Sequence, residues 1–371
     1  MAYGLHNYWW QIIWILTAGL FLKLVCLKRE EIVLCERHTR WSYWSAILLS
    51  LPYVLWAGFR TDYFGDTGVY RLDFSKIPEG IENLFTYISG VSKDKGFYLL
   101  SAIIKNIFGN SSVLYFLILA VIQMICLVLI LRKYSCDYWF SMFLFVSTCG
   151  YMSWMHNGIR QFTAVTIGYV ALSFILEKKY FIAIFLIFIA ASIHSSAIIL
   201  IPIIFIIKGR AWNKKTVISI FISIIILMYV NQFTNFLEVM LKETQYDGAV
   251  ANWQEMEDDG VNPIRVIVDC VPMLLSIVGY KFVQYENDEL IHFAVNASIV
   301  GAAIDIVAMG TSGIYMGRLP VYVSLFGTEI LLPWEIEHMF TEESQKIVKI
   351  VAIILYLLLF YYQMHFAWGI L

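Results

Sequence analysis

The feature that most constrains this chain is a series of apolar runs, most of them about twenty residues long, that are flanked by charged residues. A run of that length matches the helix needed to cross the hydrocarbon core of a bilayer. Backbone polar groups in that core must be bonded internally, so such runs form helices. With 60% hydrophobic and 15% charged residues, the 371-residue chain could not bury its apolar side chains in a soluble fold. The sequence therefore predicts an all-α polytopic membrane protein.

We expect about twelve transmembrane helices. They lie near residues 8–27, 42–59, 113–131, 139–155, 161–176, 180–194, 196–207, 216–230, 264–280, 290–309, 319–332 and 346–366. Segment 196–207 is short for a full crossing and could form a tight hairpin with the run before it. The chain has no internal repeat, low-complexity tract or linker, so residues 1–371 are expected to form a single transmembrane domain.

Positive charge alternates between the connecting segments, which assigns one set of them to the cytosol and places both termini outside. The cytosolic set contains Lys28, Arg29, Arg37, Arg40, Arg132, Lys133, Lys178, Lys179, Lys208, Arg210, Lys214, Lys215, Lys281, Lys346 and Lys349. On the outer side, the cations outside the long loops are all arginines, namely Arg60, Arg160, Arg265 and Arg318. Lysine outnumbers arginine sixteen to ten in the chain, so chance placement would have put lysines at these positions too. The presence of arginine alone therefore indicates a chemical role as well as a position on the outer side.

Arginine carries a planar fork of donors that matches phosphate oxygens, and it stays charged at any biological pH. A ring of arginines at an outer membrane surface suggests a lipid-linked phosphate or pyrophosphate as the ligand. Arg71 lies in a long loop without a motif around it and receives no such role. For Arg265 and Arg318 an alternative is that Asp269 and Asp305 neutralise them as structural pairs.

Two outer segments are long enough to do more than connect spans. Residues 60–112 contain a periodic stretch that predicts an amphipathic helix lying in the membrane interface, with Ser101, Lys105 and Asn106 opposite the apolar face. The apolar face consists of Phe97, Leu100, Ile103, Ile104, Ile107 and Phe108. Residues 231–262 form an acidic outer loop.

The first candidate site directly follows the second span, where Arg60 is followed by Asp62 and Asp66. An arginine and two carboxylates at the water boundary can hold a phosphate and accept a hydroxyl proton. The alternative is an interfacial anchor, since aromatics with mixed charges are common at membrane ends.

The second candidate site combines Asn157, Arg160 and Gln161, which offer donors, with Gly158, which permits an unusual backbone turn. Only a short turn separates the apolar runs, so Arg160 must lie near membrane depth. An arginine there is costly unless it is paired or solvated. The alternative is that its side chain snorkels to the surface.

His194 lies between two apolar runs, where a histidine is often a structural group, but beside an arginine cluster it could accept a proton. No spacing of His, Cys, Asp and Glu residues indicates a dedicated metal site, and no cofactor is predicted. The alternative of a divalent ion held loosely between carboxylates and pyrophosphate is left open. The net charge of −2 gives no indication of nucleic-acid binding.

Four pieces of sequence, spread in order over roughly residues 55–205, carry a family resemblance. They are Arg60-x-Asp62-Tyr63 with Tyr70 beyond it, Lys95-Gly96-Phe97-Tyr98-Leu99-Leu100, Gly158-Ile159-Arg160-Gln161 and Ile193-His194-Ser195-Ser196-Ala197. With them the chain resembles the EpsG family of polysaccharide polymerases, relatives of the Wzy repeat-unit polymerases. That family often has Glu-Pro before the Gly-Phe pair, where this chain has Asp94-Lys95, which speaks against an acidic role there.

The resemblance implies a fold similar to the GT-C glycosyltransferases, with a periplasmic-face cavity, in the bacterial inner membrane. It implies polymerisation of undecaprenyl-pyrophosphate-linked oligosaccharide repeat units of an exopolysaccharide, capsule or O-antigen. The growing glycan would be transferred to an incoming lipid-linked unit at the outer leaflet, with the bilayer and a chain-length regulator as further partners.

Together with the residues, the resemblance assigns pyrophosphate binding to Arg60, Arg160 and Arg318, supported by Arg265, Asn157 and Gln161. Asp62, Asp66 or His194 would act as the base, and Tyr70 is among the aromatic residues that could stack on sugar rings. Two alternatives stay open. One is an O-antigen or polysaccharide ligase or a membrane acyltransferase. The other is a transporter of lipid-linked sugars, which would place charges at mid-membrane.

Overall fold

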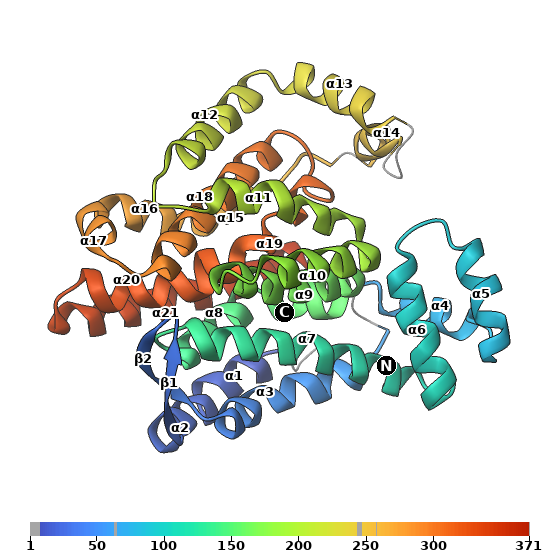
Figure 1. Cartoon of the computed structure of the whole chain (residues 1–371), viewed down its shortest axis with the longest axis horizontal. Helices are drawn as coiled ribbons and strands as arrows, with labels where there is room; N and C mark the ends of the chain where they lie inside the picture. Colours follow the sequence, from blue (N-terminus) through green and yellow to red (C-terminus); the bar gives the residue numbers. More distant parts are fainter. Residues whose placement is uncertain (1–7, 63–64, 243–246, 257, 371) are drawn as a thin grey trace. The chain divides into compact units, whose positions relative to one another are not determined.

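A computed structural model describes residues 8–62, 65–242, 247–256 and 258–370, which are helical except for one two-stranded hairpin and the connecting segments. The chain forms two compact units, one of residues 1–198 with 340–371 and one of residues 199–339. Figure 1 labels their elements. The single-domain organisation stays a prediction.

The first unit begins with two short helices and an antiparallel hairpin and continues as a helical bundle that the C-terminal helix joins. Its elements are α1 (Trp10–Leu16), α2 (Ala18–Val25), β1 (Lys28–Val33), β2 (Glu36–Trp41), α3 (Tyr43–Gly58), α4 (Thr67–Lys76), α5 (Ile81–Gly90), α6 (Lys95–Phe108), α7 (Ser112–Tyr134), α8 (Tyr138–Ser147), the π-helix η2 (Tyr151–Asn157), α9 (Ile159–Leu176), α10 (Tyr180–Ile193), the 3-10 helix η3 (Ser195–Ile199), α21 (Glu342–Tyr362) and the π-helix η6 (Gln363–Ala367).

The second unit is built around α18, and its elements are α11 (Leu200–Ile207), α12 (Lys214–Met228), α13 (Val230–Leu241), α14 (Ala249–Glu255), α15 (Pro263–Asp269), α16 (Val271–Val278), α17 (Tyr280–Tyr285), α18 (Glu289–Met309), η4 (Met316–Arg318), α19 (Val321–Ser324), η5 (Leu325–Ile330) and α20 (Leu331–Met339). Asn296 of α18 fixes the turn between α11 and α12, since its side-chain amide donates to the carbonyls of Ile207 (2.9 Å) and Arg210 (3.0 Å).

Among the described residues, four helices are long and apolar enough to cross a membrane: Ser112–Tyr134, Ile159–Leu176, Glu289–Met309 and Glu342–Ala367. The pair α12 and α13, bent by 101°, adds a fifth if it is one span. The other predicted runs also coincide with helices, but these are shorter or broken; residues 8–27, for example, contain α1 and α2. The chain is thus an α-helical membrane protein, while twelve crossings and a GT-C architecture stay predictions.

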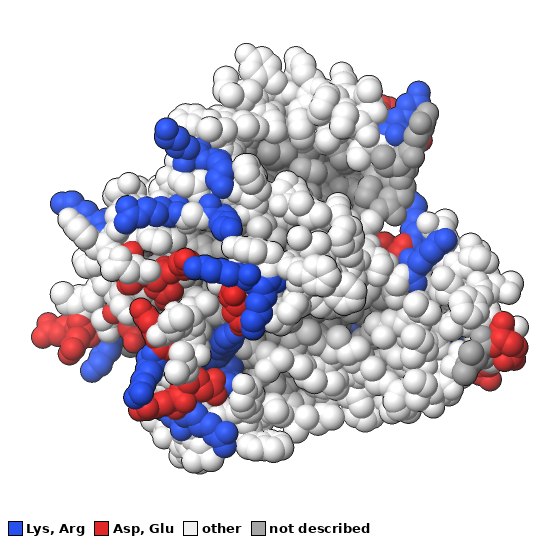
Figure 2. Space-filling model, viewed as in Figure 1, with Lys and Arg blue, Asp and Glu red and all other residues white. Residues whose placement is uncertain are grey.

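The helix α7 separates two groups of charged residues in the first unit. Its 23 residues extend about 34 Å at 1.5 Å per residue. At its N-terminus Arg71 donates to Ser112 Oγ at 3.1 Å, and at its C-terminus Arg132 pairs with Glu31 of the hairpin at 2.7 Å. Figure 1 shows the hairpin at one end of α7 and α4–α6 at the other, and Figure 2 shows charged side chains gathered over the hairpin end. Arg71 and Arg132, which the charge pattern assigns to opposite membrane faces, therefore lie at opposite ends of a membrane-length helix.

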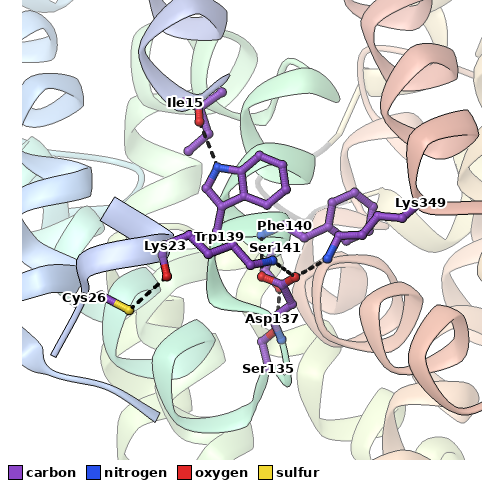
Figure 3. Close-up of polar contacts among 9 residues, drawn as sticks. All are labelled: Ile15, Lys23, Cys26, Ser135, Asp137, Trp139, Phe140, Ser141 and Lys349. Atoms are coloured by element: carbon purple, nitrogen blue, oxygen red, sulfur yellow. Dashed lines mark hydrogen bonds and ion pairs between the residues drawn. The ribbon is translucent and has the colours of Figure 1, made fainter. Parts of the chain in front are cut away.

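The helices at both termini of the first unit meet at Asp137, which caps α8 by accepting a hydrogen bond from Phe140 N at 3.2 Å. Its Oδ2 pairs with Lys23 of α2 at 2.5 Å and with Lys349 of α21. The Lys23 ammonium lies 5.1 Å from the centroid of the Trp139 ring. Figure 3 shows both lysines converging on this one carboxylate, so Asp137 joins α2, α8 and α21.

The predicted helix exists as α6, but its buried side combines residues of both predicted faces and includes Phe97 and Ile104 of the apolar one. Ser101 and Lys105 are buried, whereas Ile107 is 66% exposed. The Lys105 ammonium donates to the carbonyls of Phe74 (3.3 Å), Ser75 (2.8 Å) and Ile77 (2.6 Å), so it caps the C-terminus of α4. The Lys105 side chain thus points into the protein, because the carbonyls at the end of α4 need a donor. The location of α6 in the membrane interface stays a prediction.

Candidate functional site

Arg60, at the end of α3, is buried, and its guanidinium binds backbone carbonyls. Its Nε donates to Ala57 O at 2.5 Å, and its Nη1 donates to Met155 O at 2.7 Å and to His156 O at 3.4 Å. Burial lowers the pKa of Arg60 to about 10. Arg60 therefore ties α3 to η2 through its Nε and Nη1.

Arg71 of α4 stands beside Asp62, in a place that the sequence did not indicate. Its Nε lies 2.8 Å from Asp62 Oδ1, and its Nη2 donates to the carbonyl of Arg60 at 3.3 Å. The Asp62 side chain is 57% exposed, so one face of the carboxylate is open to solvent. Arg71 thus orients this carboxylate, and Tyr63 lies outside the described residues.

Asn157, at the end of η2, holds the start of α4. Its Oδ1 accepts a hydrogen bond from Asp66 N at 3.1 Å. Gly65 has a φ of +57°, and a Cβ at that position would overlap the Asn157 side chain. Gly65 and Asp66 therefore pack directly on η2, with the Asp66 side chain exposed.

Arg160, the second residue of α9, lies at the centre of a polar cluster. Its Nε is 3.2 Å from Asp94 Oδ2, and its Nη1 donates to Tyr98 Oη at 3.5 Å. Its backbone amide donates to Tyr70 Oη at 3.4 Å. The Arg160 side chain is 32% exposed, so part of it is open to a ligand, while Gln161 is buried in α9. An arginine near membrane depth requires a counter-ion, and Asp94 provides it for Arg160.

Asp94 connects three elements of the site. It is the N-cap residue of α6 in a left-handed conformation (φ 53°), and its side chain is 7% exposed. Besides pairing with Arg160, its Oδ1 accepts a hydrogen bond from Ser195 N at 3.1 Å. In the same turn, the Nδ1 of His194 lies 2.7 Å from Ser196 Oγ. The departure from the family pattern speaks against an acidic role at this point, yet Asp94 pairs with Arg160 and joins α9 to the His194 turn.

Gly96 explains why this part of the family pattern contains a glycine. A Cβ at Gly96 would lie 2.7 Å from the backbone carbonyl carbon of Ser192 and 2.8 Å from its oxygen. The first turn of α6 therefore packs directly on the last turn of α10, which only glycine permits. This contact sets the position of Asp94, two residues earlier in the chain.

The remaining predicted residues belong to the second unit. Arg265 Nε lies 3.4 Å from Asp269 Oδ2, one turn along α15, which confirms that Asp269 can neutralise Arg265. Asp305 of α18 is 1% exposed. Arg318 is half-buried at the end of η4. The part of Arg265 and Arg318 in binding stays a prediction.

The loop before Arg318 is held by Asp258. Its carboxylate accepts hydrogen bonds from Ser312 Oγ (2.5 Å), Gly313 N (2.9 Å) and Ile314 N (3.0 Å). Burial alone would raise the pKa of Asp258, but these hydrogen bonds lower it below its ordinary value. A charged Asp258 therefore stabilises the loop that leads to Arg318.

The first unit thus offers two kinds of group near the N-terminal end of α7, an exposed carboxylate and a partly open arginine. Asp62 can accept a proton, and Arg160 can stabilise negative charge on a phosphate. The helix α4 connects them, because its neighbouring residues Tyr70 and Arg71 contact Arg160 and Asp62 respectively. Within the described ranges, no group of three His, Cys, Asp or Glu side chains could hold a metal ion.

Comparison with known proteins gives one match. No curated protein and no solved structure matches the chain. The model of the EpsG family matches residues 43–368, which is nearly the whole chain and begins at α3. A match to this family supports a polysaccharide-polymerase type of function in general. The chain therefore belongs to the EpsG family.

Proposed function

We propose that this protein polymerises undecaprenyl-pyrophosphate-linked oligosaccharide repeat units at the outer leaflet of a bacterial inner membrane. The observation that carries the proposal is the Arg160 cluster, in which a partly exposed arginine at the head of a span is held by Asp94 and two tyrosines. An arginine fixed in this way can meet a pyrophosphate at the membrane surface without reorganising. The GT-C-like architecture belongs to this proposal.

The reaction transfers the growing glycan to one incoming unit. The acceptor hydroxyl oxygen forms a bond to the anomeric carbon of the growing chain, and the bond from that carbon to pyrophosphate breaks. The leaving pyrophosphate takes the electron pair, and Arg160 stabilises the charge that develops on it. The hydroxyl proton passes to a carboxylate, for which Asp62 is the best placed candidate because it is exposed and oriented by Arg71.

In this scheme Arg60 positions α3 against η2, since its Nε and Nη1 donate to carbonyls of these two helices. Asn157 has the same kind of role toward Asp66. His194 lies in the turn that Asp94 fixes and remains an alternative base, as does Asp66. We assign direct pyrophosphate binding first to Arg160. Phosphate binding by Arg318 with Arg265 is a separate proposal for the second unit.

Deleting the protein from the cells that make the polymer should leave lipid-linked single repeat units and remove the ladder of longer chains. Restoring the wild-type protein should restore the ladder, because chain growth is the missing step. Gel analysis of the extracted glycans measures this. Loss of attached polymer with free chains of normal length would instead identify a ligase.

We expect Gly96→Ala to shorten the polymer at normal protein level. The added methyl group pushes α6 away from Ser192 and moves Asp94 relative to Arg160. A displacement of about 1 Å in a site can cost on the order of 100-fold in rate. Gly90→Ala is the matched control, since a Cβ at Gly90 meets no atom within 4 Å. Equal chain lengths in the two variants would contradict the positioning role of Gly96.

A further inference from the structure

Next to Arg160 lies a group of side chains that the proposed chemistry does not use. They come from three consecutive helices, with Tyr70 and Asp73 on α4, Tyr87 on α5 and Tyr98 on α6. Tyr70 and Tyr98 contact Arg160 through their hydroxyl groups. Asp73 follows Tyr70 by three residues and so lies on the same face of α4. Asp73 also acts electrostatically on both Arg160 and Tyr87.

Two of the tyrosine rings are held in place by Phe97, which is 2% exposed. Its ring centroid lies 6.0 Å from that of Tyr70 and 5.9 Å from that of Tyr98, both in edge-to-face arrangements. The tyrosines themselves are half-buried, as is Asp73. The rings are therefore fixed before a ligand arrives and keep part of their surface open.

The polar groups of the cluster are suited to hydroxyl ligands. Among the described residues, the Asp73 carboxylate takes part in no hydrogen bond or ion pair, so its acceptor capacity is unused. Burial raises the pKa of the Tyr87 phenol, and Tyr98 and Asp73 raise it further. The phenol therefore stays protonated and can donate a hydrogen bond.

We propose that Tyr70, Asp73, Tyr87 and Tyr98 form a carbohydrate subsite for the sugar adjacent to the pyrophosphate at Arg160. Aromatic faces pack on the C–H faces of a sugar ring, while Asp73 accepts hydrogen bonds from its hydroxyls. A second pyrophosphate would be repelled by Asp73, and a lipid tail would leave that carboxylate without donors. A neutral polyhydroxyl ligand is not repelled by Asp73 and supplies hydrogen-bond donors to its carboxylate. This inference rests on the proposed function, because it takes the ligand at Arg160 to be a glycosyl pyrophosphate.

The test compares two probes on the purified full-length protein. One is a polyprenyl pyrophosphate without sugar, and the other is the lipid-linked repeat unit extracted from the producing cells. Asp73→Asn and Tyr87→Ala should weaken binding of the repeat unit about tenfold, which corresponds to about 1.4 kcal/mol, and should not weaken binding of the bare pyrophosphate. Tyr87→Phe, which keeps the ring, should lose less affinity than Tyr87→Ala. Glu79→Gln, at an exposed position in the same outer segment, is the control.

Equal weakening for both probes would overturn the subsite, since it would show that the variants act through Arg160. Unchanged affinity for both probes would overturn it as well. If the wild-type protein binds the repeat unit more tightly than the bare pyrophosphate but never extends it, the proposed function fails while the subsite stands.

Discussion

Replacing Arg160 by alanine is expected to abolish chain growth and to leave only single lipid-linked repeat units. The substitution removes the charge that stabilises the leaving pyrophosphate and leaves Asp94, 7% exposed, without its counter-ion. Removal of one such stabilising donor in an enzyme site costs on the order of 100- to 1,000-fold in rate. The measurement is polymer length in cells with the protein level monitored.

Arg160→Lys separates charge from geometry. Lysine keeps the charge but loses the planar fork that contacts Asp94 and Tyr98 together, so we expect a partial loss of length. Arg37→Ala, at an exposed position of the hairpin, is the matched control and should give normal polymer. Normal chain length in Arg160→Ala would remove Arg160 from the mechanism.

The second large effect is expected at the other end of α7, where Asp137→Asn should destabilise the protein without entering the reaction. The substitution leaves Lys23 and Lys349 facing each other without the carboxylate that joins them. Breaking a buried pair costs roughly 3–5 kcal/mol, and the partial exposure of both lysines reduces this to about 1–3 kcal/mol. Thermal unfolding of the purified protein in detergent measures the loss.

Glu30→Gln, at an exposed position on the same side, should leave the unfolding temperature unchanged. Equal unfolding temperatures for Asp137→Asn and wild type would show that the junction contributes nothing measurable. A normal unfolding temperature together with short polymer would instead connect Asp137 to activity.

The Asp137 junction also predicts a pH dependence. Burial alone would raise the pKa of Asp137, but Lys349 and Lys23 lower it below its ordinary value. The stabilisation is therefore complete above the unfolded-state pKa of about 3.9 and is lost as the pH falls through the lower folded-state value. The difference in unfolding temperature between wild type and Asp137→Asn should stay constant from pH 7 to about pH 5 and shrink below about pH 4. A difference that shrinks near pH 6 would exclude this carboxylate as the cause.

Much of the secondary structure could be predicted from the sequence because apolar runs and helix caps are local. The run near 113–131 became α7, and Asp137 and Asp288 cap the helices that follow them. The hairpin of residues 28–41 was not anticipated, because its charged strands show no apolar alternation and are fixed by pairing with each other and by Arg132.

The site was predictable only in part, since its key contacts join residues far apart in the sequence. Arg160 stands out because an arginine at membrane depth needs a partner, yet nothing local identifies Asp94, 66 positions earlier, as that partner. Arg71 was passed over for the same reason, because its role depends on Asp62 across a turn. For Arg60, likewise, nothing local in the sequence indicates that carbonyls of two separate helices bind its Nε and Nη1.

The most direct test of the proposed function is extension of a lipid-linked repeat unit by the purified protein in a defined bilayer. We predict a ladder of products that differ by one repeat unit, with release of one lipid pyrophosphate for each unit added and no ladder from Arg160→Ala. A wild-type protein that is folded and binds the repeat unit, yet yields no product longer than the starting unit, would contradict the proposal that this chain is the polymerase.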